Sequence, residues 1–159
     1  MPFQVRLYTD ADAAETMQLF YNTVHQVNKQ DYSPAQLDVW ASKDRDIAAW
    51  NDSLLKNKAY VVVTEANEIV GFADLAGKDY FDRLYVHHAY QKQGIATRLA
   101  EKIEACARAA GATEIFTDAS ITARPFFEKR GYVLLQEQTV MRKEVPLTNY
   151  KMRKIFSCV

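Results

Sequence analysis

The residues from Leu84 to Arg98 constrain the fold of this chain more than any other stretch. A strand-like run from Asp82 to Val86 stops at a short polar loop, and Gly94 then opens a long amphipathic helix. Backbone N–H groups are unpaired where a helix begins, and they lie at the positive end of the helix dipole. Because glycine has no Cβ, a ligand can come close to the backbone at Gly94. The stretch therefore predicts an anion site for a phosphate or diphosphate group.

The loop excludes two common classes of phosphate site. It lacks the Gly-Lys-Ser/Thr ending of the P-loop and the triple-glycine fingerprint of dinucleotide-binding proteins. Nucleoside triphosphates and NAD are therefore disfavoured as ligands.

Apolar periodicity predicts the elements that precede this unit. Residues 3–8 alternate apolar and polar side chains, as a half-buried strand does, and residues 11–27 carry apolar side chains at helical spacing. Ser33, Pro34 and Gln36 combine an N-cap, a proline at the first helical position and the glutamine of a capping box. A short helix should begin at Pro34.

Three strands and a long helix follow in the middle of the chain. Residues 59–66, 69–75 and 80–86 read as an antiparallel meander with tight turns between the strands. The helix that opens at Gly94 ends where Gly111 supplies a C-terminal cap.

The last third of the chain predicts three more strands and one helix. Residues 113–118 form a strand that should run parallel to the 80–86 strand, because the connection passes through a helix. A second helix is predicted over residues 122–130. Two closing strands, residues 132–140 and 150–156, are predicted around Pro146.

Bulk composition limits the partners of the protein. A chain of 159 residues with 48% hydrophobic content fits one domain spanning residues 1–159. Twenty basic and twenty acidic residues give no net charge, so nucleic acids and anionic membranes are disfavoured as partners. Residues 1–10 lack a signal-peptide pattern and no apolar run approaches ~20 residues, which predicts a cytoplasmic protein. We expect a monomer or a homodimer.

The cysteines and histidines do not predict a metal site. Cys106 falls on an apolar helical stripe and Cys158 is next to last, so both read as free thiols. His87 and His88 have no third ligand at metal spacing, and we interpret them as loop residues without a catalytic role.

Two motifs, in the same order along the chain, resemble the signatures of the GNAT N-acetyltransferase superfamily. Residues 91–96, Gln-Lys-Gln-Gly-Ile-Ala, match its Gln/Arg-x-x-Gly-x-Gly/Ala pattern, and they follow a Leu84–Val86 strand as in the family. Residues 123–132 resemble its second signature, Ala-x-x-Leu/Phe-Tyr-Glu-x-x-Gly-Phe. Asp-Ala-Ser-Ile-Thr-Ala at residues 118–123 and Tyr-Ser-Pro at residues 32–34 are similar to a small bacterial subgroup, so the likeness covers nearly the whole chain.

The resemblance implies a fold and an activity. The fold would be α/β (α+β), with a mixed, mostly antiparallel sheet of about six or seven strands flanked by helices. The activity would be transfer of an acetyl group from acetyl-coenzyme A (acetyl-CoA) to a primary amine by direct attack, with no metal. We favour a small-molecule amine as acceptor. A protein N-terminus or lysine as acceptor, and a sensor that binds acyl-CoA without chemistry, stay open.

By resemblance, acetyl-CoA would lie between the 80–86 strand and the following loop. The backbones of Leu84, Tyr85 and Val86 would hold its pantetheine arm. The side chains of Lys92 and Arg98 either add charge at the diphosphate or form a solvated helix face. The predicted cofactor contacts are Leu84, Tyr85, Val86, Gln91, Lys92, Gln93, Gly94, Ile95, Ala96, Thr97, Arg98, Ser120, Phe126, Phe127 and Lys129.

The reaction needs a route for the proton of the amine and a donor for the departing thiolate. Asp82 is the predicted base or cation binder, and strand alternation places it on the face of Tyr80 and Leu84. Glu65 and Asp74 on neighbouring strands are weaker alternatives.

At the thiolate, the sequence departs from the family. Phe127 stands where many relatives have a tyrosine that protonates the leaving sulfur, and phenylalanine cannot donate. Ser120 is therefore the predicted donor, with Tyr132 in reserve.

The aromatic side chains of the first third have two interpretations. Tyr32, Trp40 and Trp50 either pack in the core or wall the acceptor pocket. The predicted acceptor contacts are Tyr32, Trp40, Asp74 and Tyr80.

Overall fold

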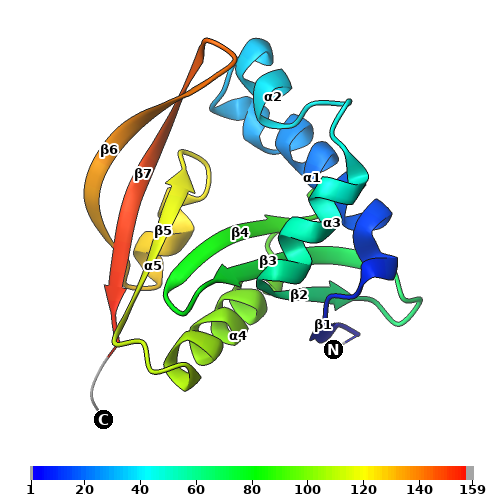
Figure 1. The fold of residues 1–159 in the computed structure, drawn as a ribbon, viewed down its shortest axis with the longest axis vertical. Helices are drawn as coiled ribbons and strands as arrows, with labels where there is room; N and C mark the ends of the chain where they lie inside the picture. Colours follow the sequence, from blue (N-terminus) through cyan, green and yellow to red (C-terminus); the bar gives the residue numbers. More distant parts are fainter. Residues whose placement is uncertain (1, 157–159) are drawn as a thin grey trace.

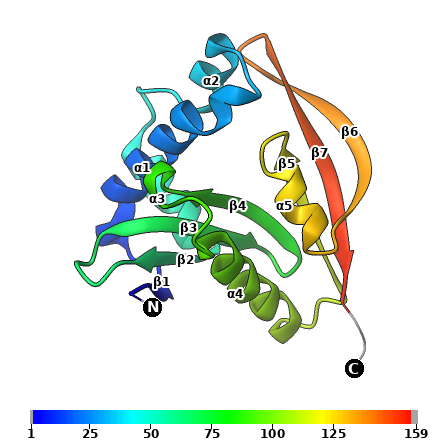
Figure 2. The ribbon, with the colours of Figure 1, turned by 180° about the vertical axis from the view of Figure 1, so that it is seen from behind.

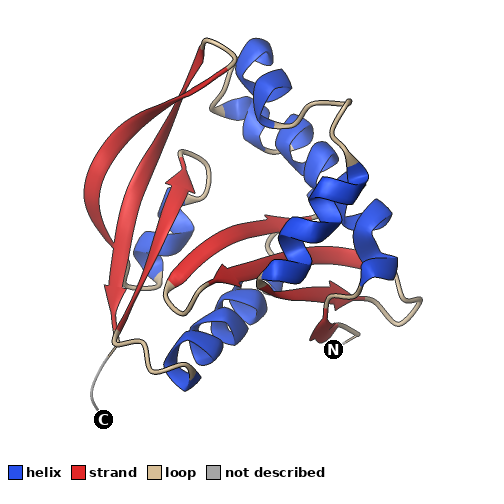
Figure 3. Ribbon diagram, viewed as in Figure 1, coloured by secondary structure: helices blue, strands red, loops and turns tan. Residues whose placement is uncertain are grey.

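A computed structural model describes residues 2–156 as one seven-stranded sheet with helices on both faces (Figure 3). The strands are β1 (Gln4–Leu7), β2 (Lys58–Val63), β3 (Ile69–Ala76), β4 (Tyr80–Val86), β5 (Glu114–Ser120), β6 (Val133–Arg142) and β7 (Val145–Ile155). The helices are α1 (Ala13–Gln26), α2 (Pro34–Trp40), α3 (Ile47–Lys56), α4 (Ile95–Ala109) and α5 (Arg124–Lys129), with short 3-10 turns η1 (Asp10–Asp12), η2 (Asn28–Gln30) and η3 (His88–Tyr90). The predicted fold class is confirmed.

The sheet divides into two parts at its only parallel pair. Its strand order is β1-β2-β3-β4-β5-β7-β6, and every neighbouring pair is antiparallel except β4 and β5. These two strands pair only at Tyr80 with Phe116 and at Phe81 with Thr117. Beyond Phe81 they diverge, and the β5-β7-β6 part turns away from the β1-to-β4 part (Figure 1).

Each face of the sheet buries its own apolar cluster. Helix α4 packs against β2, β3 and β4 on one face, and Leu99 and Ile103 are fully buried there (Figure 2). Helices α1 and α3 cover the opposite face, where Trp50, Leu54 and Phe72 are buried. The amphipathic periodicity of these helices supplies both apolar faces.

Local sequence signals set several boundaries as predicted. The Ser33 hydroxyl accepts a hydrogen bond from the Gln36 amide at 3.2 Å, and the Gln36 side chain accepts one from the Ser33 amide at 2.8 Å. This capping box starts α2 at Pro34. Gly94 adopts φ +82° at the N-cap of α4, and Gly111 adopts φ +91° after its end.

The last strand is longer than predicted. β7 begins at Val145 rather than Tyr150, so Pro146 lies within it, and the hairpin turn lies at Lys143 and Glu144 with positive φ angles. Proline is tolerated there because β5 pairs with β7 only from Asn149 onward, which leaves one edge of β7 unpaired at Pro146. The sequence prediction was wrong at this point because the distance over which β5 and β7 pair is a tertiary property.

Candidate active site

A cleft of about 840 Å³ opens where β4 and β5 diverge. Its lining comes from α1 to α3 on one side, from the edge of β4 and the start of α4, and from β5, α5, β6 and β7 on the other. The local break in pairing between two parallel strands therefore creates this hollow.

The edge of β4 presents backbone groups to this cleft. The His87 amide donates to the Val70 carbonyl at 2.8 Å, and Val86 stands opposite Gly71. Because antiparallel hydrogen bonds alternate, the N–H and C=O groups of Leu84 and Val86 point away from β3 and toward the cleft. The Val86 carbonyl accepts hydrogen bonds from Thr23 Oγ1 at 3.1 Å and from Gln91 Nε2 at 2.7 Å.

The start of α4 lies next to this edge. Residues that line the cleft there are Gln91, Lys92, Gly94, Ile95, Ala96 and Thr97. The first bond within the helix runs from the Arg98 amide to the Gly94 carbonyl at 3.0 Å, so the preceding N–H groups have no partner in the helix. No heavy atom lies within 4 Å of where a Cβ of Gly94 would be, which leaves room for a ligand.

Two of the predicted cofactor contacts at this loop lie elsewhere. Gln93 is exposed and Arg98 does not line the cleft, because its guanidinium donates to the Phe3 carbonyl at 3.0 Å. Arg98 therefore ties α4 to the N-terminal segment, a contact that no local pattern indicates.

A β-bulge places Asp82 in β4 directly after Phe81, the last residue of β4 that pairs with β5. Arg83 pairs with Asp74 and Phe81 with Leu75, so Asp82 is the extra residue of β4. Its carboxylate accepts a hydrogen bond from Asn57 Nδ2 at 3.4 Å and lies 3.8 Å from the Arg83 guanidinium. Burial, and then the charge of Asp74, raises the pKa of the Asp82 carboxyl above its usual range.

The bulge also corrects the predicted strand face. Tyr80 and Asp82 line the cleft together, but the Leu84 side chain packs against the apolar cluster beneath α4. Strict alternation would have kept all three on one side. The extra residue breaks that alternation, and nothing in the local sequence marks it.

Neither alternative carboxylate lies in the cleft. Asp74 is fully buried and does not line it; its oxygens accept hydrogen bonds from the Arg83 guanidinium and from Asn57 Nδ2 at 2.9 Å. The prediction that Asp74 contacts the acceptor is therefore wrong. Glu65 is exposed in the turn after β2.

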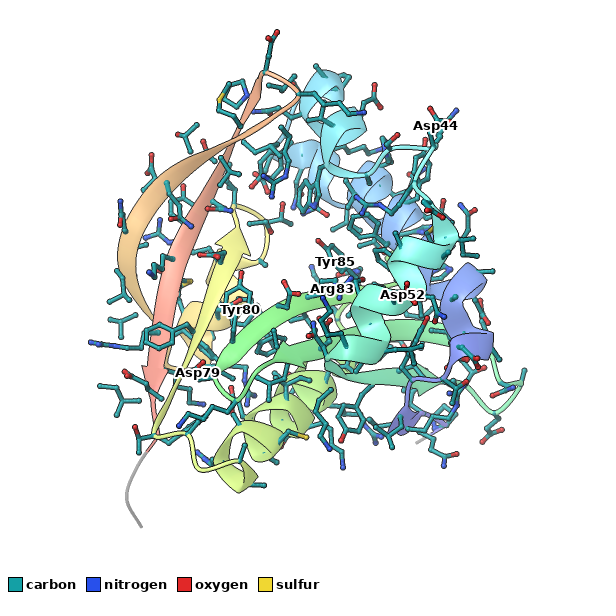
Figure 4. The ribbon with its side chains drawn as sticks, in the orientation of Figure 1. Asp44, Asp52, Asp79, Tyr80, Arg83 and Tyr85 are labelled. Carbon is teal, nitrogen blue, oxygen red and sulfur yellow. The ribbon has the colours of Figure 1, made fainter. Side chains whose placement is uncertain are left out.

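The hydroxyl of Tyr80 on β4 is hydrogen-bonded to a carboxylate on β5. It donates to Asp118 Oδ2 at 2.7 Å, and Gln138 Nε2 donates to Asp118 Oδ1 at 2.8 Å. Burial, followed by the carboxylate of Asp118, raises the pKa of Tyr80, so the phenol stays protonated. Tyr80 and Asp118 thus join β4 to β5 where their backbones separate, with Tyr80 close to β5 in Figure 4.

The α5 side of the cleft contains some of the predicted groups. Ser120 lines it, and its Oγ accepts a hydrogen bond from the Ala123 amide at 3.0 Å. Phe126 and Phe127 line it as well, and the Phe127 ring packs edge-on against Phe81 at 5.4 Å. Lys129 is exposed and lies outside the lining.

Tyr132 lies in the core rather than in the cleft. It is 3% exposed, and its hydroxyl donates to Glu104 Oε2 at 2.8 Å. Glu104 also accepts from Arg130 at 2.8 Å and from Lys154 at 3.1 Å. The reserve role predicted for Tyr132 has no support in this geometry, because its hydroxyl is already committed to a buried carboxylate.

Aromatic residues of the first third are buried or half-buried and also line the cleft. Trp50 is 3% exposed and Tyr32 is 7% exposed, yet both line the cleft. Trp40 is half-buried, and its indole N–H donates to the Tyr85 hydroxyl at 3.3 Å. The Tyr32 hydroxyl donates to the Thr148 carbonyl at 2.6 Å and accepts from the Ile121 amide at 2.9 Å.

Sequence reasoning missed four charged or polar groups of the site. Arg83 donates to Asp74 and, at 2.9 Å, to Ser53 Oγ; Figure 4 shows it beside Tyr85 on β4. Arg45 lines the cleft from the segment before α3. Asp118 and the Tyr85 side chain complete the set. The alternation of side chains along β5 could have indicated Asp118. The positions of Arg83, Arg45 and the Tyr85 side chain depend on packing between distant segments.

Across residues 2–156, no three His, Cys, Asp or Glu side chains are grouped so as to hold a metal ion. Over the same part of the chain, every helix is too short or too polar to span a bilayer. Cys106 is a free thiol beside the Tyr60 hydroxyl at 3.3 Å, and Cys158 lies outside the described residues.

Comparison with known proteins identifies the family. The acetyltransferase (GNAT) domain model matches residues 28–154. The uncharacterised N-acetyltransferase YafP of Escherichia coli strain K12 is 32% identical over 150 residues, which is 94% of each chain. The crystal structure of a GCN5-related N-acetyltransferase from Rhodopseudomonas palustris has a TM-score of 0.94 at 36% identity and covers 98% of this chain and 97% of its own.

More distant structures of the same fold contain the predicted co-substrate or its product. PaiA N-acetyltransferase from Thermoplasma acidophilum, solved with coenzyme A, has a TM-score of 0.81 at 14% identity and covers 98% of this chain and all of its own. YncA from Salmonella typhimurium, a putative acetyltransferase solved with acetyl-CoA, has a TM-score of 0.72 at 16% identity and covers all of this chain and 96% of its own. The domain model and the YafP relative confirm the predicted family: this chain belongs to the GNAT acetyltransferases.

Proposed function

We propose that the protein transfers the acetyl group of acetyl-CoA to the primary amine of a small molecule by direct attack. One observation carries this proposal. The cleft joins the free amides at the start of α4 and the exposed edge of β4 to a chamber that contains Asp82 and aromatic rings. A diphosphate, an extended arm and a reacting amine each have a matching surface there.

The co-substrate fits the backbone geometry. The N–H groups from Gly94 to Thr97 would hold the diphosphate at the positive end of α4. The N–H and C=O groups of Leu84 and the N–H group of Val86 would bond the pantetheine arm as a further strand would, because β5 has left that edge. Tyr85 would contribute its side chain on the acceptor side rather than its backbone.

The proposed acetyl transfer uses Asp82 and a backbone N–H group of β4. The amine nitrogen forms a bond to the thioester carbon, the carbon–sulfur bond breaks, and the amine proton passes to Asp82 or through water to solvent. A backbone N–H at the end of β4 would stabilise the oxyanion. The raised pKa of Asp82 makes it a better proton acceptor than an ordinary aspartate.

Ser120 is proposed to donate a hydrogen bond to the departing thiolate, and a water molecule supplies the proton that the sulfur takes up. Its Oγ already accepts from the Ala123 amide, so its O–H hydrogen is available to donate into the cleft that it lines. Phe127 leaves no phenol at the usual position.

A small-molecule acceptor is supported by the contacts that span the cleft. Tyr32 bonds the Thr148 carbonyl, and the Gln36 side chain donates to the Pro146 carbonyl at 2.8 Å, so α2 and β7 touch over the opening between the sheet parts. This bridge restricts the width available to a folded protein acceptor. A cytoplasmic location and a monomeric or homodimeric state stay predictions of the sequence.

The test measures coenzyme A release by purified protein with acetyl-CoA and a panel of primary amines. Amine-dependent thiol release with matching N-acetyl product is expected. Binding of acetyl-CoA without amine-dependent release would favour the acyl-CoA sensor that Phe127 keeps open, and acetylation of proteins alone would favour the macromolecular acceptor.

A variant tests the thiolate donor separately. Ser120→Ala should lower kcat about 10-fold or more, because a hydrogen-bond donor to a developing negative charge contributes roughly 10²-fold or more. Ser42→Ala is the matched control for loss of a hydroxyl, because Ser42 Oγ also accepts a hydrogen bond from a backbone amide, that of Asp44, and lies outside the cleft lining. Unchanged kcat and unchanged affinity for coenzyme A in Ser120→Ala would remove Ser120 from the mechanism.

A further inference from the structure

Two arginines share one tryptophan in the acceptor end of the cleft. The guanidinium carbon of Arg83 lies 5.3 Å from the Trp50 ring centre, and that of Arg45 lies 5.6 Å from it. Arg45 also lies 5.0 Å from the Phe20 ring centre. Both cations are therefore held against aromatic faces, which favour a positive charge.

The two arginines differ in whether their guanidinium groups have a carboxylate partner. Arg83 bonds the carboxylate of Asp74, the hydroxyl of Ser53 and the Ser53 carbonyl, so its donors are engaged inside the protein. Arg45 donates one hydrogen bond, from Nη2 to the Trp40 carbonyl at 3.0 Å. Across residues 2–156, no carboxylate oxygen lies within 4.0 Å of its guanidinium nitrogens.

The surroundings of Arg45 leave it suited to an external anion. Its side chain lines the cleft and remains accessible to solvent. Burial against the aromatic rings and the nearby charge of Arg83 work against its charged form, and together they lower its pKa. A bound anion would relieve both effects. The planar guanidinium can bind a carboxylate or phosphonate through two parallel hydrogen bonds.

A neighbouring phenol supplies a further donor. The Tyr85 hydroxyl accepts from the Trp40 indole, so its own O–H hydrogen is available, and Tyr85 lines the cleft. Tyr85 and Arg45 both pack on the Phe20 ring, at 4.9 Å and 5.0 Å from its centre. Burial raises the pKa of Tyr85 to about 12, so the phenol stays a donor.

Charges of opposite sign thus lie along one series of contacts. Asp82, the proposed partner of the amine, lies 3.8 Å from Arg83, and Arg83 shares Trp50 with Arg45. Because Arg83 is paired internally, Asp82 and Arg45 are one negative and one positive group on either side of it that a ligand can use.

We propose that the acceptor is an amine with an acidic group at its other end, an amino acid or a close analogue, and that Arg45 binds the carboxylate or phosphonate of that group. The inference rests on the proposed acetyl transfer and narrows its substrate class. Arg45 acts here as a specificity residue and takes no part in bond making.

The experiment compares matched amines with and without the acidic group. Coenzyme A release is measured for phenylalanine, for phenylethylamine and for the phosphonate analogue of phenylalanine, and for similar sets with other side chains. An acidic group should raise kcat/KM about 10- to 100-fold, the factor expected for a hydrogen bond to a charged group. A preference for the carboxylate or for the phosphonate supports the proposal and identifies the group.

Variants locate the effect. Arg45→Gln should abolish the preference by raising the KM for the acidic amines, so that phenylalanine is used no better than phenylethylamine. Arg108→Gln is the matched control. Arg108 of α4 lies outside the cleft, and its guanidinium carbon stacks 4.5 Å from the ring centre of Phe156. Equal or better turnover of amines without the acidic group, or a preference that survives in Arg45→Gln, would overturn the inference and leave acetyl transfer intact.

A binding measurement separates failure of this inference from failure of the proposed function. N-acetylphenylalanine and N-acetylphenylethylamine are titrated into the coenzyme A-loaded protein by calorimetry. If no amine is turned over, acetyl transfer is contradicted, and the calorimetric titrations then decide the inference. Binding of N-acetylphenylalanine but not of N-acetylphenylethylamine, lost in Arg45→Gln, supports the inference. Absence of this selective binding refutes it.

Discussion

Asp82 has a carboxyl group whose ionised form the fold disfavours. Burial, and then the charge of Asp74, raises its pKa in the folded protein above the unfolded value of ~3.9. The folded state therefore loses stability as the pH rises through the folded pKa, because ionisation costs more there than in the unfolded chain. The same charge is what the proposed reaction uses, so stability and activity should respond to Asp82 in opposite directions.

Asp82→Asn should lower kcat/KM about 10²-fold, the usual contribution of a positioned base. It should also raise the melting temperature near neutral pH, and the gain should vanish below about pH 4, where the carboxyl is protonated in both states. Thermal melts of both proteins across pH give this comparison. Asp52→Asn on the exposed face of α3 is the control, and a gain in stability of equal size there would contradict the explanation.

At the scale of elements, close contact between α4 and β3 depends on one missing side chain. A Cβ on Gly71 would lie 2.8 Å from Ile95 Cγ2 and 3.2 Å from Leu99 Cδ1. Real Cβ atoms do not approach so closely, so α4 would have to move away from the sheet. The start of α4, which lines the cleft, would move with it.

Gly71→Ala should lower the free energy of unfolding by about 1–3 kcal/mol, the usual cost of overpacking a core. It should also weaken binding of acetyl-CoA. Urea unfolding and calorimetry measure the two effects. In Gly77→Ala, where a Cβ meets nothing within 4 Å but φ is +59°, only the cost of the left-handed backbone should appear. Unchanged affinity in Gly71→Ala would show that the packing does not position the cofactor loop.

A buried ionic cluster fixes the same helix at its other end. Glu104 of α4 is 4% exposed and accepts hydrogen bonds from Arg130, Tyr132 and Lys154. Burial opposes its ionisation, but these three donors outweigh burial, and the pKa of Glu104 is lowered. The carboxylate therefore stabilises the fold above the unfolded pKa of ~4.3, and that stabilisation is lost as the pH falls through the folded pKa.

Glu104→Gln should cost about 2 kcal/mol of unfolding free energy at pH 7, since it leaves two partly buried cations without their partner. The difference from the parent protein should shrink as the pH falls below about 4. Urea unfolding at several pH values provides the measurement. Glu114→Gln removes an exposed pair with Arg153 at 3.6 Å and should cost less than ~1 kcal/mol; similar costs for both variants would be inconsistent with the buried cluster.

On the scale of the whole molecule, two parts of one sheet share only a short parallel pairing. Tyr80 and Phe81 are the only residues of β4 that pair with β5. Tyr32 provides a second connection, since its hydroxyl bonds backbone groups of Thr148 and Ile121. The opening between the two parts is therefore set at both of its ends by a few specific bonds.

Tyr32→Phe should raise the KM for the acceptor amine and lower the unfolding free energy by about 1 kcal/mol, because two hydrogen bonds across the opening are lost. Steady-state kinetics with urea unfolding test both. The control is Tyr21→Phe on α1, where the ring stacks on His25 at 4.1 Å. A loss of stability with unchanged KM would make Tyr32 a purely structural residue.

The sequence by itself determined the elements whose causes are local. The capping box at Ser33, the positive φ required at Gly94 and the two apolar periodicities gave the helices, the strands and the anion-binding loop, because each depends on residues within a turn or two. The two family motifs indicated the GNAT acetyltransferase family, which the comparisons confirm.

Only the tertiary structure decided which side chains share the cleft. The bulge at Asp82, the turning of Arg98 toward Phe3, the burial of Tyr132 on Glu104 and the exposed stacking of Arg45 each depend on segments far apart in the chain. Local propensity and spacing carry no information on such contacts, because the energy that favours them appears only when distant surfaces meet. For that reason the glycine loop before α4 could be predicted from the chain, whereas the charges to which we assign the choice of acceptor could not.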